Sequence, residues 1–183
     1  MTHFLFLNAS TRAPGQVGNT ETLTRRAAQA LPAEAQQTWL ALAGLNLPAF
    51  VDHRHTTGVY PAPEGDAKVV LDALLAATDI VFVSPVYWFS VPSPLKVCLD
   101  QWSAWMRVPG LDFKSRMAGK RLWVVATSGD RAKAQPMCDS YRLCAEFMGM
   151  AWQGVLWGKG GAPEAVLADE EALAAAPAFF ATR

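Results

Sequence analysis

The sequence predicts a doubly wound α/β domain with five parallel strands covered by helices on both faces. Five short apolar runs alternate with five segments of helical periodicity, and the runs are apolar at consecutive positions. Strands that are apolar on both faces are typical of a buried parallel sheet. Of the 183 residues, 51% are hydrophobic and 17% are charged, which is enough to form one large core. We therefore expect a single domain over residues 1–183.

The first half of the chain supplies three of the predicted strands. The runs HFLFL and IVFV are short and rich in aromatic or β-branched residues, which favours strands. The helix after the first strand stops before Pro32, because proline cannot continue a helix. In chain order we predict a strand at 3–7, a helix at 19–31, a strand at 38–42, a Pro-, Gly- and His-rich loop over 44–65, a helix at 66–78 and a strand at 80–83.

The second half repeats this alternation. Leu95, Cys98 and Trp102 have the spacing of one helix face, and Met137 and Tyr141 begin another such face. Two further apolar runs, RLWVVA and WQGVLW, are the remaining strand candidates. In chain order we predict a helix around 95–106, a strand at 121–126, a helix around 137–148, a strand at 152–157 and an alanine-rich helix over 163–176.

Charge and cysteine content exclude several classes of function. Lys+Arg and Asp+Glu both number 16, so the formal net charge is zero and nothing favours nucleic acid or an anionic membrane. We see no membrane-spanning run and no signal peptide. The three cysteines, Cys98, Cys138 and Cys144, have no C-x-x-C spacing, so we expect neither a disulfide framework nor a zinc or iron–sulfur site. A reducing cytoplasm is the expected location.

The loop after the first strand has the chemistry of a phosphate site. In a doubly wound sheet, ligands bind outside the carboxyl ends of the strands, and strands 1, 3 and 4 are adjacent in the order 2-1-3-4-5. This loop holds Ser10, Arg12 and Gly18, and the predicted helix begins at Asn19 and Thr20. Free N–H groups at a helix N-terminus bind anions, and an arginine adds charged hydrogen bonds. A flexible surface loop with an ordinary N-cap remains the alternative.

The loops after the third and fourth strands also carry candidate binding residues. Pro85, Val86, Tyr87 and Trp88 end a buried strand and can present an apolar edge to a planar ligand, although such aromatic residues can instead cap the core. The fourth strand leads into Ser128, Gly129 and Asp130. These residues could bond the edge of a heterocycle, but a strand-to-helix turn with an N-cap has the same sequence pattern.

Taken together, these loops resemble those of the NADPH-dependent FMN reductase family, the flavodoxin-like NAD(P)H:acceptor oxidoreductases. The resemblance spans roughly residues 3–157. The matching residues are Ser10, Arg12, Gly18, Asn19 and Thr20 in the first motif, Pro85, Tyr87, Lys96 and Asp100 in the second, and more loosely Ser128 and Gly129 in the third.

The resemblance implies a flavodoxin-like fold that binds FMN noncovalently. Ser10, Arg12, Asn19 and Thr20 would hold the phosphate, and the ring would lie against 85–88 with its far edge near 128–130. NADPH or NADH would reduce FMN, and the acceptor would be a quinone, azo or nitro compound, a flavin or a metal ion. No catalytic acid or base is required, because the chemistry is the cofactor's. Arg131 and Lys133 follow the third loop, but that alone does not place either in the site.

Two other function classes stay open. A flavodoxin-type electron carrier or flavin-based sensor would bind FMN without its own NAD(P)H turnover, although such carriers are usually strongly acidic. A doubly wound domain that binds another nucleotide, or none, is the third reading, because a fold alone does not fix a function.

Other polar residues have structural interpretations. Asp52, His53 and His55 have a spacing that can bind a metal, but no further ligands are evident and we expect no metal site. Glu21 follows the phosphate loop, and we expect its side chain to point outward, because a carboxylate would weaken anion binding. The acidic run 169–171 is interpreted as a solvated helix face.

Two further expectations concern an ion pair on one predicted helix and the assembly of the protein. Lys96 and Asp100 are four residues apart, so an intrahelical ion pair is expected, with the alternative that Lys96 orders the neighbouring loop. Family members often dimerise, so we expect a homodimer, and Trp102 and Trp105 are candidates for its interface.

Overall fold

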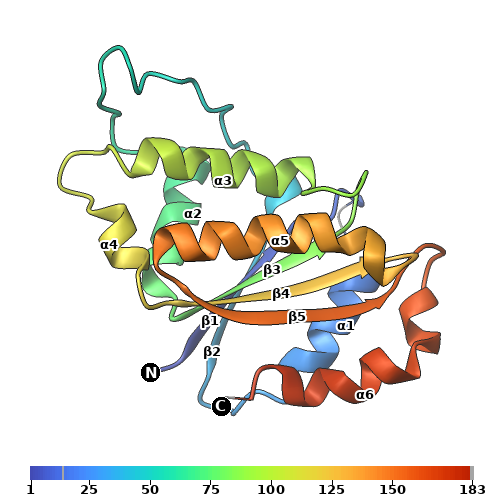
Figure 1. Ribbon diagram of the computed structural model, residues 1–183. Helices are drawn as coiled ribbons and strands as arrows, with labels where there is room; N and C mark the ends of the chain where they lie inside the picture. Colours follow the sequence, from blue (N-terminus) through green and yellow to red (C-terminus); the bar gives the residue numbers. More distant parts are fainter. Residues whose placement is uncertain (14, 182–183) are drawn as a thin grey trace.

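The computed structural model describes residues 1–13 and 15–181 and contains a five-stranded parallel sheet (Figure 1). The strand order is β2-β1-β3-β4-β5, as predicted, and each neighbouring pair is parallel. Every predicted strand is present, and no end differs from its prediction by more than two residues. The strands are β1 (His3–Asn8), β2 (Gln36–Ala41), β3 (Asp79–Pro85), β4 (Arg121–Ser128) and β5 (Ala151–Lys159).

Helices cover both faces of this sheet (Figure 1). One layer contains α1 (Asn19–Ala28) and α6 (Glu170–Phe179). The other contains α2 (Gly65–Ala76), α3 (Ser93–Trp105), α4 (Phe113–Met117) and α5 (Arg131–Met148). Two short 3-10 helices, η1 (Leu42–Gly44) and η2 (Ala165–Ala168), complete the described elements.

The structure corrects three helix predictions. α5 begins at Arg131, six residues before the predicted start around 137. The five-residue helix α4 was missed, because it is too short to show helical periodicity. The last helix begins at Glu170 and not at 163. The Asp169 carboxylate accepts the Ala172 N–H and caps α6, while η2 is a separate turn. Asp169 also accepts the Lys159 N–H at 2.7 Å, so it is a cap and not part of a solvated face.

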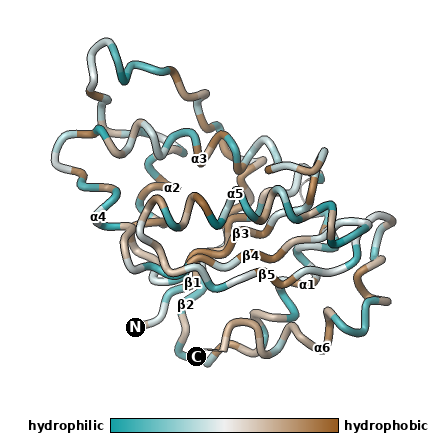
Figure 2. The backbone as a smooth tube through the Cα atoms, viewed as in Figure 1, coloured by the Kyte–Doolittle hydropathy of each residue, from teal (hydrophilic) through white to brown (hydrophobic). Residues whose placement is uncertain are grey.

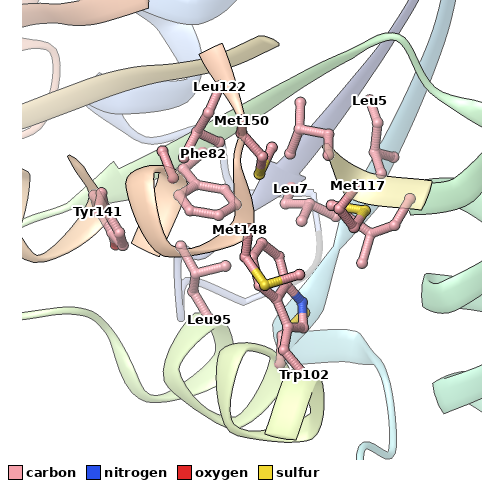
Figure 3. Packing of buried hydrophobic residues seen from close by; sticks show 14 of the residues in the cluster. Leu5, Leu7, Phe82, Leu95, Trp102, Met117, Leu122, Tyr141, Met148 and Met150 are labelled. Atoms are coloured by element: carbon pink, nitrogen blue, oxygen red, sulfur yellow. The ribbon is translucent and has the colours of Figure 1, made fainter. Parts of the chain in front are cut away.

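The apolar strands divide their side chains between two cores. Leu5 and Leu7 face the layer of α2 to α5, whereas Phe4 and Phe6 face α1 and α6. Figure 3 shows the first core, where side chains from strands and helices interdigitate around Phe82. In Figure 2 the buried strands are brown, while the helices alternate between brown and teal. Burial on both faces explains why the central strands β1, β3 and β4 contain continuous apolar runs in the sequence.

A buried ion pair fixes the register of β3 on β4. Asp79 is fully buried, and Arg121, its partner residue across the two strands, donates two hydrogen bonds to its carboxylate at 2.5 and 2.7 Å. The Trp123 indole N–H and the Thr78 hydroxyl supply two more donors at 2.8 Å. These bonds lie at the amino ends of β3 and β4. They therefore stabilise the end of the sheet that is opposite the candidate binding loops.

Hydropathy gives no sign of a transmembrane helix. Within residues 1–13 and 15–181, no helix combines the length and the apolar character needed to cross a bilayer.

Candidate functional site

The predicted loops after β1, β3 and β4 meet in one cleft of about 370 Å³ at the carboxyl ends of the strands. All predicted site residues line it except Asp130. The Asp130 carboxylate accepts the Ala132 N–H at 2.9 Å and caps α5 instead. The lining residues are Ser10, Arg12, Gly18, Asn19, Thr20, Glu21, Pro85, Val86, Tyr87, Trp88, Phe89, Thr127, Ser128, Gly129, Lys133 and Gly161.

One end of the cleft is formed by the N-terminus of α1. Gly18 is the N-cap residue, and no side chain caps the helix there. The guanidinium of Arg12 lies across this residue, so a Cβ at Gly18 would be only 3.0 Å from its Nε. Glycine therefore lets Arg12 approach the first turn of the helix. The uncapped N–H groups and a guanidinium together form an anion-binding arrangement.

The side chains of Asn19 and Thr20 make contacts within the protein. Asn19 donates to the carbonyl of Ala162 at 2.9 Å and accepts the Val166 N–H, which ties the segment after β5 to α1. The Thr20 hydroxyl pairs with the Thr127 hydroxyl at 2.5 Å in a buried position. What these two residues offer to a ligand is therefore their backbone N–H groups, which point out of the helix N-terminus.

Glu21 lies in the cleft, contrary to the expectation that it points outward. Its side chain is only 13% exposed and accepts the Asn8 amide at 3.0 Å. Arg25, one turn further along α1, pairs with the same carboxylate at 2.7 Å and lies over the Trp39 ring. This ion pair offsets the negative charge of Glu21, so the anion-binding arrangement beside it is kept.

An exposed aromatic turn forms the wall after β3. Trp88 is 92% exposed and Phe89 52%, so neither residue caps the core and that alternative is wrong for both. Tyr87 and Ser90 form a backbone bridge that closes a two-residue turn. Trp88 and Phe89 have φ values of 50° and 60°, the type I′ pattern that favours Asn-Gly. Two aromatic residues there store backbone strain beside the cleft.

The loop after β4 supplies backbone groups more than side chains. The Ser128 hydroxyl donates to the Asp130 carbonyl at 2.6 Å and accepts the Trp157 indole N–H at 2.8 Å. Gly129 faces open space, so it leaves the cleft unobstructed. The next residue of the wall, Gly161, comes from the segment after β5.

Sequence reasoning missed five lining residues: Glu21, Phe89, Thr127, Lys133 and Gly161. Thr127 and Phe89 adjoin predicted site residues, so wider motif bounds would have included them. Lys133 was considered and left out, because its place one turn into a helix does not fix where its side chain points. Gly161 follows a strand whose loop the topology rule does not place at the site.

Two buried core residues have raised pKa values. Burial raises the pKa of Cys98 to about 12 and also raises that of Tyr141, whose hydroxyl bonds Ser84 at 2.7 Å. Both are therefore protonated at neutral pH. Lys96 and Asp100 form the predicted intrahelical pair at 2.6 Å, with both side chains partly exposed.

The residues that line the cleft therefore offer hydrogen-bond donors, cations and aromatic surface.

The Asp52–His55 segment is held by an internal ion pair. Arg54 donates to the Asp52 carboxylate at 2.8 and 2.6 Å and lowers the pKa of that group. Within the described part of the chain, no three His, Cys, Asp or Glu side chains are grouped as metal ligands.

Comparisons with known proteins agree on one family. The sequence profile described as NADPH-dependent FMN reductase matches residues 2–162. A putative NAD(P)H-dependent FMN-containing oxidoreductase, YwqN of Bacillus subtilis (strain 168), is 32% identical over 173 residues, which are 93% of this chain and 92% of that protein.

Solved structures show the same fold. The Trp repressor binding protein from Bacillus subtilis superposes with a TM-score of 0.74 at 27% identity, covering 98% of this chain and 99% of that one. An FMN-dependent NADH-azoreductase from Bacillus anthracis in complex with FMN has a TM-score of 0.63 at 16% identity, covering 97% and 94%. At that lower identity the likeness concerns the fold alone.

Proposed function

Because this chain belongs to the NADPH-dependent FMN reductase family, we propose that the cleft at the carboxyl ends of β1, β3 and β4 is its FMN site. The protein is an FMN-dependent NAD(P)H oxidoreductase. The observation that carries the assignment to this cleft is its two-part chemistry. The uncapped N-terminus of α1 and Arg12 form one end of the cleft. The exposed aromatic turn after β3 forms one of its walls.

The donor set fits FMN part by part. The backbone N–H groups of Asn19 and Thr20, together with Ser10 and Arg12, suit a phosphate dianion. Gly18 keeps the approach to these groups open. The cleft volume of about 370 Å³ lies within the usual range for small-molecule and cofactor sites.

The remaining predicted residues suit the ring. Pro85, Val86, Tyr87 and Trp88 provide an apolar wall, and the backbone at Ser128 and Gly129 provides hydrogen-bonding groups for a heterocycle edge. When bound, FMN supplies the redox chemistry by taking a hydride from NAD(P)H and passing two electrons to a small acceptor. The protein residues position the two reactants and exclude water from between them.

Anaerobic addition of NADPH, and then of NADH, to the protein supplied with FMN tests this function. We expect rapid bleaching of the visible flavin band, because the chain belongs to a family of NAD(P)H-dependent FMN reductases. The two rates also rank the donors. A bound flavin that stays yellow would identify an electron carrier or sensor reduced by a partner. A protein that binds no flavin would contradict the assignment of the cleft.

We also propose that two copies associate through an apolar groove between α3 and α5. The groove has a volume of about 470 Å³, and Leu143 and Phe147, one turn apart on α5, are more than half exposed at its edge. Such exposed apolar surface favours protein association. Trp102 is buried and lines the groove, while Trp105 is buried away from it, so the exposed residues of α5 replace both as interface candidates.

Replacing Leu143 and Phe147 with glutamate is expected to convert the dimer to a monomer, because two carboxylates would be buried without partners in each half of the interface. Light scattering during size-exclusion chromatography measures the mass. Val69→Glu on α2 is the matched control, since Val69 is an exposed apolar helix residue outside the groove. A wild-type protein of monomer mass would remove the dimer proposal.

The cytoplasm is the proposed location. Cys98, Cys138 and Cys144 are all free, which suits a reducing compartment. Burial raises the pKa of Cys98 to about 12 and that of Cys138 to about 11, so these two thiols stay protonated and unreactive.

A further inference from the structure

We propose that Lys133 holds a positive charge at the pyrimidine side of the FMN ring and thereby favours the reduced cofactor. This inference rests on the proposed function, because it requires that FMN occupies the cleft. Lys133 lines the cleft from the first turn of α5, directly after the Ser128–Gly129 loop that is proposed to contact the ring edge.

The cleft contains two cations at separate places. Arg12 lies against Gly18 at the start of α1, where the phosphate is proposed to bind. Lys133 lies on α5, beyond β4. The carboxylate of Glu21 also lines the cleft, but it is already paired with Arg25. The charge of Lys133 is therefore left to act on whatever occupies the cleft beside the β4 loop.

Among the described residues, Lys133 has no ion-pair partner of its own, unlike Lys68 and Lys96. The Asp130 carboxylate at the start of the same helix is engaged as the N-cap of α5. The first turn of α5 contains no acidic residue, and a cation there is opposed by the positive end of the helix dipole. Negative charge in the cleft would interact favourably with both the ammonium group and the helix end.

Hydride transfer creates such a charge. A hydride carries two electrons and one proton. When it leaves C4 of the nicotinamide, the donor becomes NAD(P)⁺. A neutral isoalloxazine ring that accepts this hydride would gain one negative charge. A cation fixed beside the ring stabilises the product and not the reactant, so it raises the reduction potential. Lys133 is thus assigned an electrostatic role and no role in proton transfer.

The test compares the midpoint potential of bound FMN in the wild type and in Lys133→Met, which keeps the length of the side chain and removes its charge. Removing one neighbouring charge from a partly solvated site is expected to weaken binding of reduced FMN about tenfold. Binding of oxidised FMN should change less than about twofold. For a two-electron couple, the tenfold change corresponds to a potential about 30 mV lower. Lys133→Arg should restore the wild-type potential.

Arg131→Met is the matched control. Arg131 belongs to the same helical turn but lines a different hollow, beside Trp157 between α5 and β5. Its loss should leave the potential unchanged. Equal potentials in Lys133→Met and the wild type would overturn the inference.

A second outcome would also overturn it. If Lys133→Met instead raised KM for NADPH but not for NADH, and left the potential unchanged, the role of Lys133 would be to bind the 2′-phosphate of the donor. FMN titration of the wild type separates these results from failure of the proposed function. If the wild type binds no FMN, both proposals fall, whereas a wild type that binds and is bleached leaves only the role of Lys133 in question.

Discussion

Arg12→Ala is expected to weaken FMN binding by about 1.5–3 kcal/mol, the range for hydrogen bonds to charged groups. The affinity would fall roughly ten- to 150-fold. The physical reason is the position of Arg12 over Gly18, where its guanidinium adds a full positive charge to the partial charge of the uncapped α1 N-terminus. Quenching of FMN fluorescence during titration measures the dissociation constant.

Arg26→Ala is a suitable control, because Arg26 is exposed in the last turn of the same helix. It removes the same charge far from the cleft, so FMN affinity should be retained. Salt provides a second check. Raising the ionic strength should weaken binding to the wild type more than to Arg12→Ala, since the variant has lost the screened charge. An unchanged dissociation constant in Arg12→Ala would remove this residue from the site.

Most of the sheet could be predicted from the sequence, because its central strands β1, β3 and β4 are buried on both faces. The centre of β3, residues 80–83, is an unbroken apolar run, and alternate residues of β1 enter different cores. Helix ends were harder to predict. The alanine-rich composition continues through η2 and α6, and only the Asp169 cap separates them, so composition alone set the start of the last helix too early.

The location of the site followed from topology, but its side-chain contacts did not. Adjacent strands place their loops together whatever the loop sequence is. In contrast, Asn19 and Thr20 bond segments far away in the chain, and Glu21 turns into the cleft where Arg25 can pair with it. Such partners depend on packing, and no short motif encodes them.

The aromatic turn shows the same limit more sharply. Tyr-Trp-Phe is a sequence pattern shared by core caps and ligand walls, and local propensity disfavours a type I′ turn at Trp88 and Phe89. The structure nevertheless places both residues in the left-handed region. A local rule broken at a cleft edge points to a functional requirement, because strain persists only where the surroundings enforce it.

The double variant Trp88→Asn/Phe89→Gly is therefore expected to be more stable than the wild type and less effective as an enzyme. Asparagine and glycine adopt positive φ at low cost, so relief of two strained residues should raise the free energy of unfolding by about 1–3 kcal/mol. Urea denaturation measures this gain. The bridge between Tyr87 and Ser90 is made of backbone hydrogen bonds, so the turn itself should persist in the variant.

Loss of the two exposed rings removes apolar surface from the cleft edge, where a planar acceptor would stack on it. The variant should therefore have a higher KM for 1,4-benzoquinone, used as a test acceptor. Because Trp88 also belongs to the proposed wall of the FMN ring, this KM is measured with FMN at saturation. Phe50→Gly, in the loop before α2, is the control, since it removes an aromatic ring outside the cleft. A variant with unchanged KM and raised stability would mean that the strained turn serves a contact other than the acceptor. Unchanged stability would mean that the left-handed conformations of Trp88 and Phe89 carry no cost.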